Sequence, residues 1–459
     1  MNIFTHADHI LRSAERAILQ SDGVDLTAAG FDQTQKHALD FLLALNYLKP
    51  DETGCGFVPA TLDPCTAENR HALLKLASKL NRAFQLPSPH APGAVFFGGT
   101  ISAATFGLSQ HGDGAASAGG RGTDFQSAFE SCLGEAAEYI SFLQRENDPK
   151  IVAVDTLGSI DRLNDVWAMG GLGKPENPVP DNLDWVEARS LLDRSARLVP
   201  AGLVLRSPCS TARKTDSSGL GAGVSKYQAI QSALLEIVER DAAALWWYGG
   251  VVPGLIDESI QSETGFIKYA ASLRGDTQRQ YWLLDITTDL NIPAVAALSA
   301  LPDGTAVVAG FSAATEILDA MRNAFLEMCQ MEIAQDLAFL KLHQEGLQAL
   351  HQQDHAWINR SRALTVIDYP HLKQHKPFHL RRFCGDRPPL DFLLGNLARR
   401  GFEPLSIDLT RHELDIAVVR VIVPGLQSHD PSWVADRLRD HARADRLKTA
   451  ANGGAYSPI

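Results

Sequence analysis

The sequence predicts a mixed α/β fold, and two observations lead to that prediction. After residue 92 the chain alternates short runs of β-branched or apolar residues, bounded by turn formers, with longer segments whose apolar residues recur at helical spacing. Before it, helical spacing dominates, notably at Ala14–Leu19 and Ala38–Leu48. We therefore expect an α/β (α+β, mixed-sheet) domain preceded by a mostly helical N-terminal extension.

A proline-rich break at Leu86–Gly93 divides these two parts, so we expect an extension over residues 1–92 and the main domain over 93–459. In the main domain the expected strands are 198–205, 280–286, 294–300, 306–310 and 416–423, and the expected helices are 125–143, 227–247 and 313–342. The run L-D-I-T at Leu284–Thr287 is echoed as I-D-L-T at Ile407–Thr410, each before a second apolar run. This echo suggests a repeated strand-turn-strand unit.

Composition excludes several classes of protein. The 459 residues are 45% hydrophobic and 21% charged, as in ordinary globular proteins. A net charge of −12 argues against a general nucleic-acid surface. The N-terminus lacks the pattern of a secretory signal, and the longest apolar run, Ala294–Ala309, contains Pro302 and Asp303, so we expect a cytoplasmic protein without a membrane span. Six scattered cysteines without a C-x-x-C pair indicate neither structural zinc nor disulfides.

Two helices carry paired glutamates in otherwise apolar sequence. Glu135 and Glu138 follow the glycine-rich run Gly119–Gly122, and Glu236 and Glu239 follow a second such run. Residues three apart share one helix face, where two carboxylates repel each other. Such a pair suits either a solvated helix edge, with a salt bridge to the adjacent arginine, or an oxygen-ligated Mg²⁺.

Other candidate motifs are weaker. Lys174 follows glycines but is itself followed by Pro175 and not by the Ser or Thr of a Walker loop, so we expect no phosphate loop. His351 and His355 lie in a polar, Gln-rich segment and are expected to be solvated. Pro377 interrupts any helix that would align the nearby histidines. The run Trp246–Tyr248 is expected in the core, with substrate stacking as the alternative.

The run S-S-G-L-G-A-G before A-L-L-E-I-V-E-R-D-A, together with the earlier S-C-L-G-E-A-A-E, resembles the YcaO superfamily from about Gly98 to the C-terminus. The resemblance implies a YcaO-like fold that binds ATP through Mg²⁺-ligating glutamates and activates a peptide backbone amide. It also implies which residues form the site. The cofactor-binding residues are Arg121, Ser131, Glu135, Glu138, Gln228, Glu236, Glu239, Arg240 and Glu327; the metal ligands among them are Glu135, Glu138, Glu236 and Glu239, and the catalytic residues are Glu239 and Arg240.

The chain departs from the family pattern at several positions. Arg121 stands where the family often has Lys, Val224 where it has Asn, and Gln228 where it has Glu. Arg322 and Asn323, near Glu327, match the family's later motif, but a purely structural role is the alternative. The sequence ends Ala455–Ile459 with a single late proline, whereas heterocyclising members often end in a proline-rich tail.

The resemblance implies ATP-dependent cyclodehydration of Cys, Ser or Thr residues to azolines in a ribosomally made peptide. The alternatives are thioamide formation with a sulfur-delivering partner, which would use the same ATP site, and a non-catalytic nucleotide-binding scaffold. The expected partners are the precursor peptide, a separate leader-binding protein, because no fused leader-binding module is evident, and a flavin-dependent azoline dehydrogenase. A homodimer is also expected.

Overall fold

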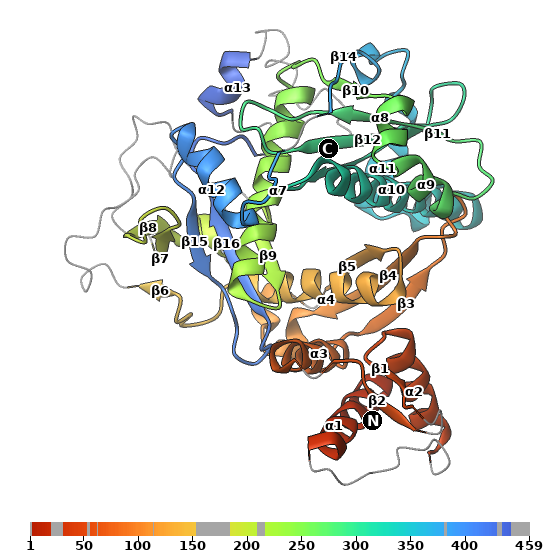
Figure 1. Ribbon diagram of the computed structural model, residues 1–459, viewed down its shortest axis with the longest axis vertical. Helices are drawn as coiled ribbons and strands as arrows, with labels where there is room; N and C mark the ends of the chain where they lie inside the picture. The colour runs from red at the N-terminus through yellow and green to blue at the C-terminus, as the bar shows by residue number, and fades with distance from the viewer. Residues whose placement is uncertain are drawn as a thin grey trace.

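The computed structural model describes residues 2–19, 31–52, 56–61, 63–112, 114–152, 184–208, 216–380, 383–428 and 434–441. The helices and sheets form a main body around a central opening, and the N-terminal extension projects from one end of it (Figure 1). Lys174 and the C-terminal segment Ala455–Ile459 lie outside the described residues.

The extension is mostly helical, as expected. It contains α1 (Ile3–Leu19), α2 (Gln33–Ala44), α3 (Pro64–Ala77) and one antiparallel pair of short strands, β1 (Leu48–Pro50) and β2 (Phe57–Pro59). Aspartates cap α2 and α3: Asp32 accepts a hydrogen bond from the Gln35 amide, and Asp63 from the Thr66 amide. The expected helix to Leu48 was too long, because the chain leaves the helix at Asn46, whose φ is 52°, and enters β1.

Three antiparallel strands follow, with order β3 (Arg82–Leu86), β4 (Val95–Ser102), β5 (Ala115–Gly122), and α4 (Phe125–Phe142) packs against β4 and β5. Helix α4 begins and ends within one residue of its predicted bounds. Strand β3 precedes residue 92 and pairs with β4, which follows it. We therefore propose that the extension ends before β3.

Two larger sheets complete the main body. One has the order β6 (Ile151–Val152), β7 (Trp185–Ser190), β15 (Leu405–Asp408), β16 (Ala417–Ile422), β9 (Leu220–Gly223), with β8 (Ala196–Pro200) also paired to β7. The other has the order β13 (Val308–Ala313), β12 (Ala294–Ala300), β11 (Gln280–Asp285), β10 (Gly254–Ile256), β14 (Lys376–Pro377). Helix α7 (Lys226–Trp247) packs on the first sheet through β9 and β16, and α10 (Ile317–Glu345) packs on the second through β12 and β13.

The expected strand over 198–205 was wrong in its second half. Strand β8 ends at Pro200, and residues Ala201–Val204 form the short helix α6. The local hydrophobic pattern did not distinguish the continuation of the strand from a short helical turn, which is the usual ambiguity of short apolar runs. The remaining helices are α8 (Glu258–Glu263), α9 (Phe266–Leu273), α11 (Gln352–Ala363), α12 (Pro389–Arg399) and α13 (Asp436–His441), with 3-10 turns at Ala103–Phe106, Ser109–His111, Leu347–Ala349 and Pro370–Leu372.

The predicted strand-turn-strand repeat is confirmed. β11 pairs with β12 and β15 with β16, both antiparallel. In both turns a threonine hydroxyl accepts the amide of the second strand: Thr287 from Ala294, and Thr410 from Val418. Asn291 and Asp415 occupy equivalent places with φ of 52° and 58°. The echo in the sequence therefore encodes two similar turns, of which the second is one residue longer.

Glycines let two helices approach their strands closely. A Cβ atom added at Gly120 of β5 would lie 1.8 Å from the carbonyl oxygen of Ala128 in α4. One added at Gly221 of β9 would lie 2.2 Å from the carbonyl oxygen of Ala229 in α7. The glycine-rich runs thus place the acidic helices directly on their strands.

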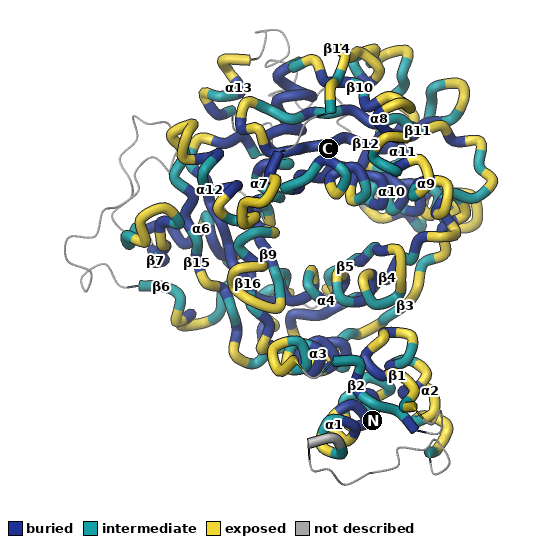
Figure 2. The backbone as a smooth tube through the Cα atoms, viewed as in Figure 1, coloured by how far each residue is buried: buried dark blue, intermediate teal, exposed yellow. Residues whose placement is uncertain are grey.

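Two large hydrophobic clusters form most of the core of the described residues, and a third, small one joins α10 to α11 through Ala338, Leu350 and Ile358. Of the two large clusters, the first surrounds α7, α10 and the five-stranded sheet, and the second joins α1, α2 and α3 to α4, β4 and β16. Figure 2 shows buried residues both in the extension, at α3, and in α4 of the main body, and both helices belong to the second cluster. None of the helices within the described ranges has the length and apolar character needed to cross a membrane.

Candidate active site

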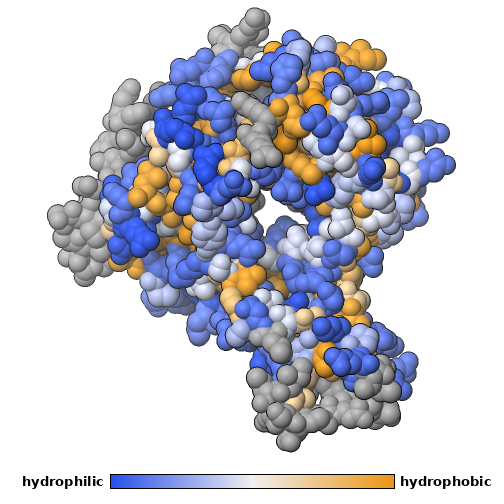
Figure 3. Space-filling view, viewed as in Figure 1, coloured by the Kyte–Doolittle hydropathy of each residue, from blue (hydrophilic) through white to orange (hydrophobic). Residues whose placement is uncertain are grey.

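Helices α4, α7 and α10 line one cavity of about 950 Å³. The space-filling view is hollowed at the centre of the molecule, between the segments that carry these helices (Figure 3). All nine expected cofactor-binding residues line this cavity: Arg121, Ser131, Glu135, Glu138, Gln228, Glu236, Glu239, Arg240 and Glu327. Residues more than 200 positions apart in the sequence are therefore brought together around one space.

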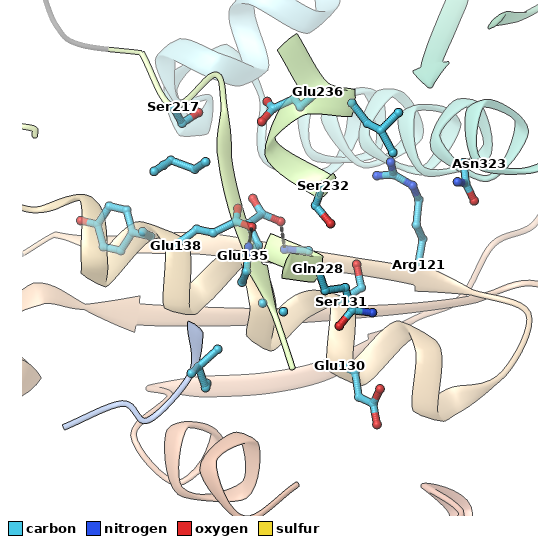
Figure 4. Close-up of a pocket in the computed structure, with 18 of the residues that line it drawn as sticks. Arg121, Glu130, Ser131, Glu135, Glu138, Ser217, Gln228, Ser232, Glu236 and Asn323 are labelled. Atoms are coloured by element: carbon cyan, nitrogen blue, oxygen red, sulfur yellow. Dashed lines mark hydrogen bonds between the residues drawn. The ribbon is translucent and has the colours of Figure 1, made fainter. Parts of the chain in front are cut away.

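Helix α4 contributes Glu135 and Glu138, which point into the cavity (Figure 4). The Gly119 amide donates to Glu135 Oε2 at 2.8 Å, and the Ala222 amide of β9 donates to Glu138 Oε1 at 2.7 Å. Loss of hydration within the protein raises the pKa of both carboxyl groups, and Glu236 opposite adds to the rise. The pKa of Glu138 reaches about 8.

Helix α7 contributes Glu236, Glu239 and Arg240. Glu236 accepts a hydrogen bond from the Gly219 amide at 3.1 Å and lies 3.4 Å from Arg240 Nη2. Glu239 Oε1 is buried 3.6 Å from Arg240 Nη1 and has no hydrogen-bond partner among the described residues. Burial raises the pKa of Glu239 to about 8, against the opposing effect of Arg240 and with a further contribution from Glu327.

The charge of Arg240 is stabilised by this arrangement. Burial alone would lower its pKa, but the carboxylates of Glu239 and Glu236 outweigh burial and raise it above the ordinary value. Arg240 therefore stays cationic in the cavity, where it can face phosphate oxygens.

Helix α10 and strand β5 supply the third side. Glu327 Oε2 accepts the Phe311 amide at 2.8 Å and lies 3.7 Å from Arg121 Nη2. The Arg121 guanidinium also donates from Nη1 to Gln330 Oε1 at 3.1 Å. Arg121 thus holds β5 and α10 together at the edge of the cavity.

The three helices share one hydrogen-bonding arrangement. In each, a glutamate accepts a hydrogen bond from a main-chain amide of the preceding strand or turn: Gly119 to Glu135, Gly219 to Glu236 and Phe311 to Glu327. The donor precedes the acceptor by 16, 17 and 16 residues respectively. Two of these units contain the glycine-rich runs seen in the sequence, but the third has no such run before Glu327, so the sequence did not reveal it as a repeat.

The donor set fits Mg²⁺ with ATP. The carboxylates that face one another in the cavity outnumber Arg121 and Arg240, the pKa of four of them is raised, and Glu239 keeps a buried oxygen without a hydrogen bond to any described residue. Among the described residues, no three His, Cys, Asp or Glu side chains are close enough together to hold an ion by themselves. Mg²⁺ typically takes one or two carboxylates and completes its shell with water and nucleotide phosphates, so the acidic side chains of this cavity suit it together with ATP.

The other residues singled out in the sequence have varied places. Gln228 lines the cavity, but its Oε1 accepts the Val224 amide at 3.0 Å, so it also fixes the start of α7. Asn323 lines the cavity. Arg322 is absent from the cavity lining; it lies 5.3 Å from the Tyr269 ring centre and pairs with Asp319, which favours the structural alternative for this residue.

The aromatic run after Arg240 belongs to the core, as expected. Trp246 and Trp247 are buried, and Trp247 stacks on Tyr369 with ring centres 5.7 Å apart. Neither Trp residue lines the cavity. His351 and His355 are exposed, which agrees with the expectation that they are solvated.

Sequence reasoning missed part of the cavity wall. Asn69 and Leu73 reach it from α3 of the extension, and Glu130 and Tyr139 line it from α4. Tyr139 lies four residues after Glu135, a helical spacing that could have identified it, whereas Glu130 lies five residues before Glu135 and has no such signal. Helix α3 reaches the cavity through tertiary packing, and no local sequence pattern predicts that contact.

Comparison with solved structures agrees with this fold. YcaO from Methanopyrus kandleri, solved with AMPPCP and Mg²⁺, is 21% identical, with a TM-score of 0.61 over 82% of this chain and 95% of that chain. The microcin synthetase McbBCD complex of E. coli matches at 12% identity, with a TM-score of 0.58 over 82% and 96%. A heterocyclase in complex with substrate and cofactor matches at 20% identity and a TM-score of 0.56; the match covers 78% of this chain but only 52% of that one.

The family of this protein is shown by its sequence. Residues 119–427 match the family described as YcaO cyclodehydratase, ATP- and Mg²⁺-binding. The matched range contains the whole of α4, α7 and α10 and every expected site residue. The expected cofactors, ATP and Mg²⁺, are those of this family, and the acidic cavity fits them. The chain therefore belongs to the YcaO family of ATP-dependent enzymes.

Proposed function

We propose that this protein uses ATP to modify backbone amides of a ribosomally made peptide, by cyclodehydration of Cys, Ser or Thr residues to azolines. The observation that carries the proposal is the convergence of glutamates from three helices, with Arg121 and Arg240, on one cavity of about 950 Å³. A space of that size lies near the upper end for small-molecule sites, so it can take a nucleotide and a short length of peptide.

The proposed reaction closes a ring on the substrate. The side-chain thiol or hydroxyl group of the substrate residue loses its proton to solvent as its sulfur or oxygen bonds to the preceding carbonyl carbon. The former carbonyl oxygen takes the γ-phosphoryl group of ATP, with release of ADP. Loss of inorganic phosphate and of the amide proton then leaves the C=N bond of the azoline. ATP with Mg²⁺ supplies the leaving group, because an amide oxygen leaves readily only once it is phosphorylated.

The residues of the cavity have distinct proposed roles. Mg²⁺ would be held by carboxylate groups, each from a different residue: Glu135, Glu138, Glu236 and Glu239. Arg240, held 3.4 to 3.6 Å from two of them, would face the charge that develops on the phosphoryl group. A protein nucleophile is not needed, and burial raises the pKa of the nearby Cys132 thiol to about 12, so that thiol stays protonated.

The partners belong to the same proposal. The extension has one pair of three-residue strands, and we propose that a separate protein captures the leader of the precursor peptide. A flavin-dependent azoline dehydrogenase would act on the product, and the enzyme would work as a cytoplasmic homodimer. The E. coli microcin synthetase, which is a complex of several proteins, supports the expectation of partner subunits.

The test is the intact mass of a candidate precursor peptide after incubation with the protein, Mg²⁺, ATP and the leader-binding partner. We expect the loss of one water per modified residue. Glu239→Gln should lower both this product and ATP turnover at least a hundredfold, since it removes one ligand of the ATP-bound metal. Glu345→Gln, at the exposed end of α10, is the matched control and should behave as wild type.

Other measured masses of the peptide would assign a different function. Replacement of oxygen by sulfur would assign thioamide formation, which uses the same ATP chemistry with a different nucleophile. An unchanged peptide, with Glu239→Gln as active as wild type in the cell, would assign the scaffold role and overturn the catalytic one.

A further inference from the structure

Helix α3 of the N-terminal extension forms one wall of the cavity. Cys65, Asn69 and Leu73 are four residues apart and so lie on one stripe of this helix. Asn69 and Leu73 line the cavity, and Cys65 Sγ lies 3.8 Å from the Val224 carbonyl oxygen, in the loop between β9 and α7. The stripe therefore faces the start of α7 and the space beside it.

Packing with the main domain fixes this wall in place. The Tyr47 hydroxyl donates a hydrogen bond to Glu130 Oε1 at 3.0 Å, and the Arg70 guanidinium lies 4.5 Å from the Tyr47 ring centre. Glu130 itself lines the cavity beside Ser131. Leu73 is buried in the same core cluster as Leu133 of α4. The extension is thus joined to the cavity by both polar and apolar contacts.

Charge is unevenly distributed around the cavity. The ion pairs of Arg121 and Arg240 lie between β5, α7 and α10. In Figure 1, α3 and α10 lie on opposite sides of α4. The stretch of wall next to α3 offers mostly neutral groups: the Asn69 and Gln228 amides, the Ser131 hydroxyl and the Val224 side chain. The Glu130 carboxylate also lies there, and its Oε1 already accepts hydrogen bonds from the Tyr47 hydroxyl and the Gln126 side-chain amide. Phosphates and Mg²⁺ suit the charged end, which leaves the α3 end for the nucleoside.

The Asn69 side chain is suited to form hydrogen bonds with a nucleobase at the α3 end of the cavity. It is half-buried at the cavity wall, and it makes no hydrogen bond with any described residue. Gln228, by contrast, already accepts the Val224 amide. An asparagine amide offers a donor and an acceptor side by side, which is the pattern that complements the N7 atom and the 6-amino group of adenine.

We propose that Asn69 recognises the adenine base of ATP and that α3 is the base-side wall of the nucleotide site. This inference rests on the proposed use of the cavity for ATP. It makes the extension a part of the nucleotide site, although Asn69 lies outside the range that matches the family.

The test measures binding of Mg²⁺–ATP, Mg²⁺–GTP and Mg²⁺–tripolyphosphate to the full chain by calorimetry. Asn69→Leu should weaken ATP binding about tenfold or more and leave tripolyphosphate binding unchanged. Asn69→Asp keeps the shape, replaces the donor by an acceptor and adds a negative charge, so it should also weaken ATP binding; its effect on tripolyphosphate binding measures the part that is due to charge alone. Glu68→Gln, an exposed neighbour on the same helix, is the control and should bind as wild type.

Several outcomes would overturn the proposal. These are unchanged ATP affinity in both Asn69 variants, an equal loss for ATP and tripolyphosphate, or a change confined to the KM for the peptide, which would place peptide and not nucleotide against α3. If these occur while wild type still modifies its peptide, the proposed function stands and only the role of Asn69 fails. If the wild-type protein binds no nucleotide, both the proposed function and the proposed role of Asn69 are wrong.

Discussion

At the scale of single residues, the cavity contains carboxyl groups with raised pKa values, and these are the proposed ligands of Mg²⁺. Burial and mutual repulsion raise the pKa of Glu138 and Glu239 to about 8, so both carry protons at pH 7 when no cation is present. A divalent cation binds the ionised form and must displace these protons. Metal binding and proton release are therefore coupled.

We predict that binding of Mg²⁺ with a non-hydrolysable ATP analogue at pH 7 releases about one to two protons. The affinity should rise between pH 6 and pH 8 and level off above, as the two groups ionise without the cation. Calorimetry in buffers of different ionisation enthalpy measures the proton count. Glu138→Gln should reduce the release; no buffer dependence in wild type would contradict the raised pKa values.

The same two groups set a pH dependence of stability. In the folded protein without cation each has a pKa of about 8, whereas an unfolded glutamate titrates near 4.5. Between these values the folded state binds more protons, so the contribution of these groups to the free energy of unfolding falls as pH rises from about 4.5 to 8. Chemical unfolding should show that Glu138→Gln flattens this slope. A slope unchanged by the substitution would contradict the assignment.

The site residues were predictable from the sequence where chemistry and spacing coincide. The paired glutamates of α4 and α7 are such a case, since each pair lies within one helix and stands out from its apolar surroundings. Their hydrogen bonds to backbone amides were not predictable, because Glu138 receives its donor from Ala222, 84 residues away. Asn69 was missed for the same reason.

At the scale of elements, the glycine-rich strands set the distance between strand and helix. The Ala128 carbonyl oxygen occupies the space that a Cβ atom at Gly120 would need, and main-chain atoms of α7 do the same at Gly221. Because these contacts are with backbone, no side-chain rotation can relieve them.

We predict that Gly120→Ala lowers the free energy of unfolding by about 3 kcal/mol and displaces α4 from β5. Gly395→Ala is the matched control: it lies inside α12, its new Cβ would meet no atom, and it should stabilise by about 0.5–1 kcal/mol. Denaturant unfolding measures both. Equal stability of the two variants would show that the strand and helix are not in close contact at Gly120.

Elements with a strong internal pattern were predicted well. α4, α7 and β12 lie within one residue of expectation, because each carries a long periodic or continuous apolar run between clear turn formers. The errors fall where the signal is short: β8 ends at Pro200, and α10 begins at Ile317, four residues later than expected, because β13 extends to Ala313. Strand pairing supplied the deciding contacts there.

At the scale of the whole molecule, the extension and the main body form one structure. α1, α2 and α3 share a hydrophobic cluster with α4, β4 and β16, and Tyr47 bonds to Glu130 in the cavity wall. The sequence distinguished the helical character of the extension but could not show that its helix α3 reaches the cavity, since that contact depends on how two regions pack.

We predict that a chain beginning at residue 79, just before β3, is markedly less stable than the full chain, because the apolar face of α4 loses its cover. Thermal unfolding of purified protein measures this, and increased binding of a hydrophobic dye would report the exposed face. As a control, Lys75→Ala, an exposed change on α3, should leave the melting temperature unchanged. A truncated chain as stable as the full one would show that the extension is an independent unit.

We propose that ATP removes the oxygen of a backbone amide. To test this, the precursor peptide is prepared with a heavy oxygen isotope in the backbone carbonyl before the modified residue, and that oxygen is followed during turnover with Mg²⁺–ATP and the leader-binding partner. We expect the label to leave the peptide and to be recovered in inorganic phosphate, one atom per ring formed. Label that leaves as water, or that stays in the peptide while ATP is consumed, would contradict the proposal.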